Sequence, residues 1–155
     1  MRFSFILSKF LKYGTLLTSL GFIFTVTLQI YARFFLNDVP PWTEEASRIL
    51  FIYATAFAGG LAYKGNYFVF LEAFYAGFSP QTQKTVDLIS PILCLILFGT
   101  FAFYSLDLIE MGFSERSPSL QIIMGVPFLS LLILSLSIGY FSLLTLLKKI
   151  KFWKS

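Results

Sequence analysis

Histidine is absent from the sequence, and cysteine occurs once, as Cys94. Without histidine the chain cannot bind haem or metal through imidazole, and catalysis by a histidine-based pair is excluded. A single thiol cannot form a disulfide within the chain, so we interpret Cys94 as a small buried hydrophobic residue. No glycine-rich phosphate loop with lysine is present, and Gly59-Gly60 within an apolar run indicates close helix packing instead. We therefore predict no catalytic, cofactor or metal site.

Charged residues are also few, and long stretches contain none. Asp, Glu, Lys and Arg make up 13% of the sequence and hydrophobic residues 57%, whereas in soluble domains about a quarter of the residues are charged. Four apolar runs with charged flanks are each long enough to cross a bilayer, because about twenty helical residues rise about 30 Å. We predict an all-α integral membrane protein with one domain, residues 1–155, and spans at about 13–33, 44–64, 86–108 and 121–147.

The net charge of +4 does not indicate a nucleic-acid partner, because the basic residues are spread over the ends of the predicted spans. Lipid phosphate is the expected counter-charge. Nine of the twelve basic residues belong to the N-terminus, the connection between the second and third spans, and the C-terminus. Only Arg33, Arg48 and Arg116 lie on the other side. The positive-inside rule then predicts that both termini face the cytoplasm.

Residues 65–79 connect the second and third spans and are too few to cross the membrane. Asn66 and Glu72 supply sparse polarity there. Apolar side chains recur at spacings of three or four, namely Tyr67, Phe70, Leu71, Phe74 and Phe78. This pattern predicts a short amphipathic helix that lies in the membrane plane.

Prolines mark the expected ends and bends of the later helices. Ser79-Pro80 is typical of a cap followed by proline at the first helical position. The third helix should continue through Pro91, which should bend it, and should end near residues 107–112. We expect Ser117-Pro118 to lie outside the last helix and Pro127 to kink it.

A polar cluster precedes the second span, in the sequence Pro40-Pro41-Trp42-Thr43-Glu44-Glu45 with Arg48 one turn later. The paired prolines disfavour a continuous helix, so the chain should turn here, and Thr43 should cap the next helix. Glu44 and Glu45 would lie in the first turn, where the helix dipole favours negative charge. Arg48 is spaced to pair with either glutamate.

Arg33, at the end of the first span, is expected to reach lipid phosphate or to meet Glu44 or Glu45 across the turn. Trp42 is placed to lie in the membrane interface. The cluster has two interpretations, which the sequence leaves open. Its ion pairs either fasten the start of the helix or contact a partner subunit.

Acidic residues also gather at the end of the third span. Asp107 and Glu110 are three apart, and Glu115-Arg116 follow. We interpret this group as a solvated helix end, with a cation site as the alternative.

These elements together resemble a known family. The run Arg33-x-x-x-Asn37, then Trp42-x-Glu44-Glu45-x-x-Arg48-x-Leu50-Phe51-x-Tyr53, is similar to the small membrane subunit, or Q subunit, of tripartite ATP-independent periplasmic (TRAP) transporters. The polar break from Lys64-Gly65-Asn66 to Glu72 and the entry Ser117-Pro118-x-Leu120 before Pro127 match as well. One departure is Phe68, where members often have histidine.

The resemblance implies a non-catalytic subunit in the bacterial inner membrane. Its implied partners are a large membrane subunit, which carries substrate and sodium sites for an organic acid, and a periplasmic substrate-binding protein. The small subunit would brace the scaffold of the large one. Residues expected in the structural or interface cluster are Arg33, Trp42, Glu44, Glu45, Arg48 and Glu72. Candidates for docking the binding protein are Asp38, Asp107, Glu110 and Glu115.

The residues leave two other functions to consider, a transporter that works alone and an enzyme. A self-contained proton-coupled exporter of small molecules, acting as a homodimer, would need an ionisable group near the middle of a span. None of the four runs has one. A membrane enzyme acting on lipid would need a metal or nucleophile site at the polar rim. The adjacent Glu44 and Glu45 point in different directions on a helix, so they do not form such a site.

Overall fold

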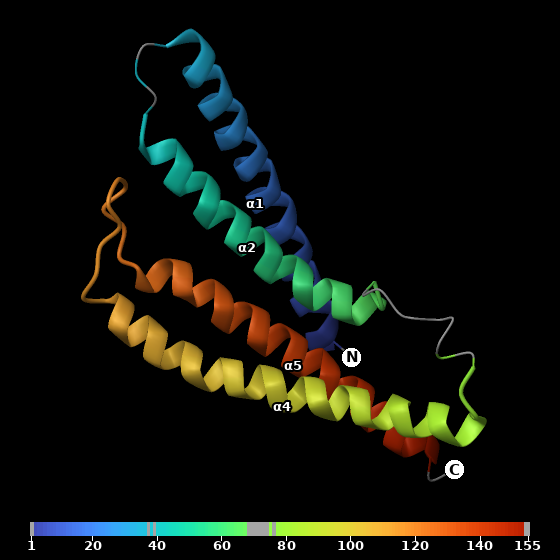
Figure 1. The fold of residues 1–155 in the computed structure, drawn as a ribbon. Helices are drawn as coiled ribbons and strands as arrows, with labels where there is room; N and C mark the ends of the chain where they lie inside the picture. The colour runs from blue at the N-terminus through green and yellow to red at the C-terminus, as the bar shows by residue number, and fades with distance from the viewer. Residues whose placement is uncertain (1, 37, 39, 68–74, 76, 154–155) are drawn as a thin grey trace.

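Four long helices make up most of the protein, in a computed structural model that describes residues 2–36, 38, 40–67, 75 and 77–153. They are α1 (Arg2–Phe35), α2 (Trp42–Gly65), α4 (Pro80–Gly112) and α5 (Gly125–Trp153), labelled as in Figure 1. Each has the length and apolar composition needed to cross a membrane. The described residues therefore confirm the predicted all-α class with four helices able to cross a membrane.

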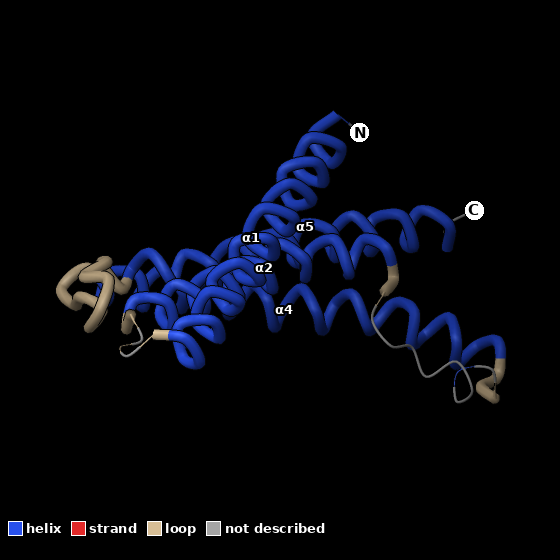
Figure 2. Tube along the Cα trace, turned by 90° about the horizontal axis from the view of Figure 1, so that it is seen from above, coloured by secondary structure: helices blue, strands red, loops and turns tan. Residues whose placement is uncertain are grey.

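The helices form two antiparallel hairpins joined along one seam. Helix α1 packs on α2 and α4 packs on α5, while the contact between α2 and α5 joins the two hairpins. Helices α1 and α4 thus lie on the two outer sides of the α2–α5 pair (Figure 1). Seen from above, α1 runs at an angle to the other helices (Figure 2). The arrangement is open, so long apolar faces of α1 and α4 remain uncovered.

Helices α1 and α4 begin well before the predicted spans. Helix α1 starts at Arg2 and α4 at Pro80, with the Ser79 hydroxyl accepting a hydrogen bond from the Thr82 N–H as the expected cap. The predicted path of α4 through Pro91 to its end at Gly112 is also observed. A helix need not stop where apolarity stops, because its polar turns can project into water.

A small core joins three of the helices near the N-terminus. Leu11, Phe57 and Phe141 form it, and each comes from a different helix. The rings of Phe3 and Tyr140 meet edge to face at 5.3 Å. Helix α1 therefore contacts both hairpins at this end of the molecule.

Small residues bring α2 and α5 close together along the seam. A Cβ added to Gly60 would lie 2.5 Å from the Ser137 hydroxyl oxygen and 3.0 Å from a Leu11 methyl group. The neighbouring Gly59 faces Leu134 of α5 in the same way. The predicted close packing at Gly59-Gly60 is confirmed, and it is typical of helix contacts in membranes.

A chain of hydrogen bonds links three helices further along the seam. The Tyr63 hydroxyl of α2 donates to the Ser142 hydroxyl of α5 at 3.0 Å. Ser142 in turn donates to the main-chain carbonyl of Pro91 in α4 at 2.7 Å. Ser142 is fully buried, so its hydroxyl depends on these two partners.

Two expectations about helix starts are wrong. Pro127 does not kink the last helix, because α5 begins at Gly125 and so places Pro127 in its first turn, where a missing N–H costs nothing. Thr43 does not cap α2, because the helix already begins at Trp42 without a side-chain cap. The buried Thr43 hydroxyl instead donates to the Pro40 carbonyl at 2.8 Å.

Most of the predicted in-plane helix at 65–79 falls on residues outside the described part, and so does Glu72. Among those described, Gly65 belongs to α2, and Asn66 ends that helix in the left-handed conformation. Tyr75 and Phe78 are fastened to α4, because the Gln83 side-chain amide donates to both their carbonyls. The in-plane helix therefore stays a prediction.

Candidate functional site

The polar cluster predicted before the second span lies beside the connection from α4 to α5. This connection, the α4–α5 loop (residues 113–124), is a compact hairpin closed by an antiparallel bridge between Arg116 and Ile123. The Ser117 N–H donates to the Ile122 carbonyl at 2.9 Å, and the Met124 N–H donates to the Glu115 carbonyl at 3.0 Å. The main chain of the loop is thus ordered by its own hydrogen bonds, and Ser117-Pro118 lies outside the helices as predicted.

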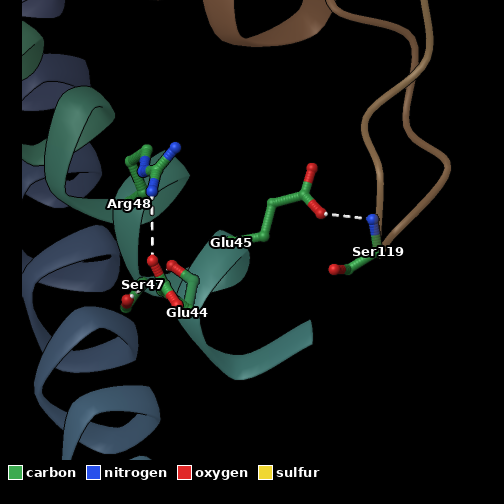
Figure 3. Close-up of polar contacts among 5 residues, drawn as sticks. All are labelled: Glu44, Glu45, Ser47, Arg48 and Ser119. Atoms are coloured by element: carbon green, nitrogen blue, oxygen red, sulfur yellow. Dashed lines mark hydrogen bonds and ion pairs between the residues drawn. The ribbon is translucent and has the colours of Figure 1, made fainter. Parts of the chain in front are cut away.

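Glu45 ties this loop to the first turn of α2. Its Oε2 atom accepts hydrogen bonds from the main-chain N–H groups of Ser119 and Leu120, each at 2.9 Å. The Ser117 hydroxyl also hydrogen-bonds to this carboxyl group. Figure 3 shows Glu45 reaching toward Ser119, away from Arg48. Charged acceptors form stronger hydrogen bonds than neutral ones, so this contact anchors the loop.

Glu44 makes the ion pair that the spacing predicts. Its Oε1 atom lies 3.2 Å from Nη2 of Arg48, one turn later in α2 (Figure 3). The Glu44 side chain is 67% exposed and that of Arg48 is 70% exposed. An exposed pair with this spacing contributes only about 0.3–0.5 kcal/mol to stability. The two adjacent glutamates therefore have different roles, since one pairs locally and the other binds a distant loop.

The expected ion pair of Arg33 with Glu44 or Glu45 is not seen among the described residues. Arg33 is exposed in the last turn of α1, and the ion pairs among the described residues are Arg48 with Glu44 and Lys149 with Asp87. Trp42 is the first residue of α2 and is 40% exposed. The structure thus brings Glu44, Glu45 and Arg48 together with the α4–α5 loop, a partner that the sequence analysis missed.

The acidic residues considered for docking are all exposed at this same end of the molecule. Asp38 follows α1, Asp107 and Glu110 lie in the last turns of α4, and Glu115 lies in the α4–α5 loop. Within the part of the chain that the structure describes, no group of three or more Asp, Glu, Cys or His side chains could hold a metal ion.

A groove opens between the first turns of α2 and α5. Its volume is about 470 Å³. Its walls are mainly apolar and include Ile49 and Ile52 from α2 and Phe128 and Leu131 from α5. Glu44, Glu45 and Arg48 line its other end, beside the α4–α5 loop. The groove is therefore amphipathic along its length.

The opposite end of the α4–α5 hairpin carries a second polar contact. Lys149 lies 3.0 Å from Asp87, which joins the end of α5 to the start of α4. Desolvation, together with a hydrogen bond to the Asp87 carboxylate and its negative charge, raises the pKa of Tyr75. The raised pKa reflects the cost of placing a phenolate beside a carboxylate, so Tyr75 acts here as a neutral donor.

Comparison with known proteins identifies the family. Residues 22–152 match the family described as tripartite ATP-independent periplasmic transporters, DctQ component. A putative TRAP transporter small permease protein of Haemophilus influenzae is 24% identical over 151 residues, which are 97% of this chain and 92% of that protein.

A longer relative contains a matching segment. The isethionate TRAP transporter permease protein DctMQ of Oleidesulfovibrio alaskensis is 29% identical over 120 residues, or 72% of this chain. The match spans only 19% of the length of that relative. With most of its own length matched and four helices able to cross a membrane, this chain belongs to the DctQ family, the small, non-catalytic permease component of TRAP transporters.

Proposed function

We propose that this protein braces the large membrane subunit of a sodium-coupled, binding-protein-dependent organic acid transporter. The observation that carries the proposal is the open helix arrangement. In the most apolar stretch of each of the four helices no more than 33% is buried within the chain, so much apolar surface is available to lipid and to a larger membrane partner. No Asp, Glu, Lys or Arg lies in the middle of any of the four helices, so an ion-coupling site is expected in that partner.

The internal packing suits a brace. Glu45 ties the first turn of α2 to the loop before α5, and near the other end of α2 Gly60 and Tyr63 contact Ser137 and Ser142 of α5. Interiors packed this closely transmit force rather than deform. The name DctMQ of the Oleidesulfovibrio relative joins an M and a Q component in one chain, which supports a large membrane subunit as the partner.

The proposed orientation follows from charge. Lys64, Lys149 and the other basic residues at the end where the termini lie would face the cytoplasm. The α4–α5 loop and the start of α2 would then face the periplasm of a bacterial inner membrane. In this orientation the acidic residues at the periplasmic end are available to the binding protein.

Copurification and vesicle transport test the brace together. We expect a tagged small subunit to copurify with the large subunit, and uptake into vesicles to require both subunits, the binding protein and a sodium gradient. Because the proposal gives this chain no solute site, vesicles that contain it alone should show no transport. Solute accumulation by the isolated chain would instead favour the homodimeric proton-coupled exporter, and a large subunit fully active alone would contradict the brace.

The docking role of the acidic residues has its own test. Changing Asp38, Asp107, Glu110 and Glu115 together to Asn or Gln should raise the binding-protein concentration needed for half-maximal uptake several-fold at low salt. The difference should shrink at high salt, because exposed charges act mainly through screened attraction. Copurification of the two membrane subunits should not change. An unaltered concentration dependence at low salt would show that these residues do not contact the binding protein.

A further inference from the structure

The groove between α2 and α5 lies on a face that α1 does not cover. On α2, Leu50 and Phe57 point toward α1, where they contact Gly21 and Gly14. The groove residues Glu45, Ile49 and Ile52 follow a different stripe of the same helix, because successive residues turn by about 100°. The groove is therefore open on the side of α2 that faces away from α1.

Charge at one end of the groove selects the kind of group that fits there. Two carboxylates, Glu44 and Glu45, line that end together with a single guanidinium, that of Arg48. The local formal charge is negative, so the site attracts a cation and repels a phosphate. A lysine or arginine side chain fits this end better than an anionic lipid headgroup.

The depth of the groove wall in the membrane determines which kind of partner can reach it. Ile52 follows Glu45 by seven residues, which is about 10 Å along the helix axis. With Glu45 at the membrane surface, Ile52 and Leu131 lie within the hydrocarbon region. A protein that stays outside the membrane cannot reach this wall, whereas a transmembrane helix can cover both the wall and the charged end.

We propose that a transmembrane helix of the large membrane subunit packs into this groove. Its apolar side chains cover Ile49, Ile52 and Leu131, and a lysine or arginine about two turns away lies beside Glu44. The inference rests on the proposed function and adds to it the docking face and the chemistry of the contact.

Site-specific photocrosslinking tests the docking face. A photoreactive amino acid is placed at Ile52 in full-length protein, coexpressed in membranes with the large subunit and the binding protein. The control position is Ile23 of α1, which is 58% exposed and beside Phe22, whose ring packs on Phe51 at similar depth. We expect an adduct with the large subunit at Ile52 and at least a tenfold weaker one at Ile23.

The other occupants give distinct outcomes. A lipid-sized mass increase at Ile52 without a protein adduct, or an adduct with the binding protein, would overturn the proposal. An adduct of similar yield at Ile23 would show that the groove is not the preferred face. In each of these cases, normal copurification of the two membrane subunits would leave the brace itself intact.

A charge comparison tests the contact at Glu44. Glu44→Gln removes a carboxylate that faces the partner cation, and it should weaken binding of the large subunit about two- to fivefold, the range for an exposed ion pair. Arg48→Gln removes the competing cation and should leave binding unchanged or stronger. Equal weakening by both variants would mean that the Glu44–Arg48 pair acts only within α2, and weakening by Arg48→Gln alone would indicate an anionic occupant. Either result overturns the proposal.

Discussion

Replacing Gly60 by leucine is expected to force apart the two helical hairpins. The new Cβ would lie 2.5 Å from the Ser137 hydroxyl oxygen and 2.7 Å from the Ser137 Cβ, so α2 and α5 would have to separate. Overpacking of a tight contact costs about 1–3 kcal/mol. For a chain of this size the loss corresponds to a fall of roughly 2–12 °C in Tm in a thermal unfolding assay in detergent.

Gly99→Leu provides the matched control. Gly99 lies in α4, and a Cβ built there meets no heavy atom within 4 Å. The same glycine-to-leucine change should therefore leave Tm nearly unchanged. If both variants lowered Tm equally, helix propensity or detergent contact would explain the effect, and the close approach at Gly60 would not.

Replacing Glu45 by alanine is expected to release the α4–α5 loop from α2. The main-chain N–H groups of Ser119 and Leu120 would lose the carboxylate that accepts their hydrogen bonds. In a hydrogen-exchange measurement on the full chain, we expect protection of these two amides to fall by about tenfold, because local opening no longer breaks a charge-assisted contact.

Glu44→Ala is the control for this variant, since it removes the adjacent carboxylate without touching the loop. Its partner Arg48 is largely exposed and remains hydrated when unpaired. Protection at Ser119 and Leu120 should therefore match the parent protein. Unchanged protection in the Glu45 variant would show that the loop is held by its own hairpin bonds alone.

The helices could be predicted because hydropathy and helix signals are local. Apolar length identified the four helices, Ser79-Pro80 marked the start of α4, and Gly59-Gly60 marked a close contact between helices. Hydropathy was misleading at the start of the last helix. Ile122 and Ile123 are as apolar as a membrane span, yet they belong to a loop, so Pro127 lies in the first turn of α5.

The partner of Glu45 could not be predicted from the sequence. Its carboxylate accepts hydrogen bonds from the main-chain N–H groups of Ser119 and Leu120, which are 74 and 75 positions later in the sequence. Every residue except proline carries such a donor, so the sequence does not single out these two. Spacing therefore favoured Arg48, whose charge is visible in the sequence. Only the fold shows that Glu44 pairs with Arg48 while Glu45 binds the α4–α5 loop.

The buried Ser142 hydroxyl also fixes how deep each hairpin sits relative to the other. It has one hydrogen, which it gives to Pro91, so it can only accept from Tyr63. Sliding one hairpin past the other by a single helical turn, about 5.4 Å, would separate the Tyr63 hydroxyl from Ser142 and break this hydrogen bond between the hairpins. The two halves of this protein therefore have one vertical register, and a partner that holds either half positions both.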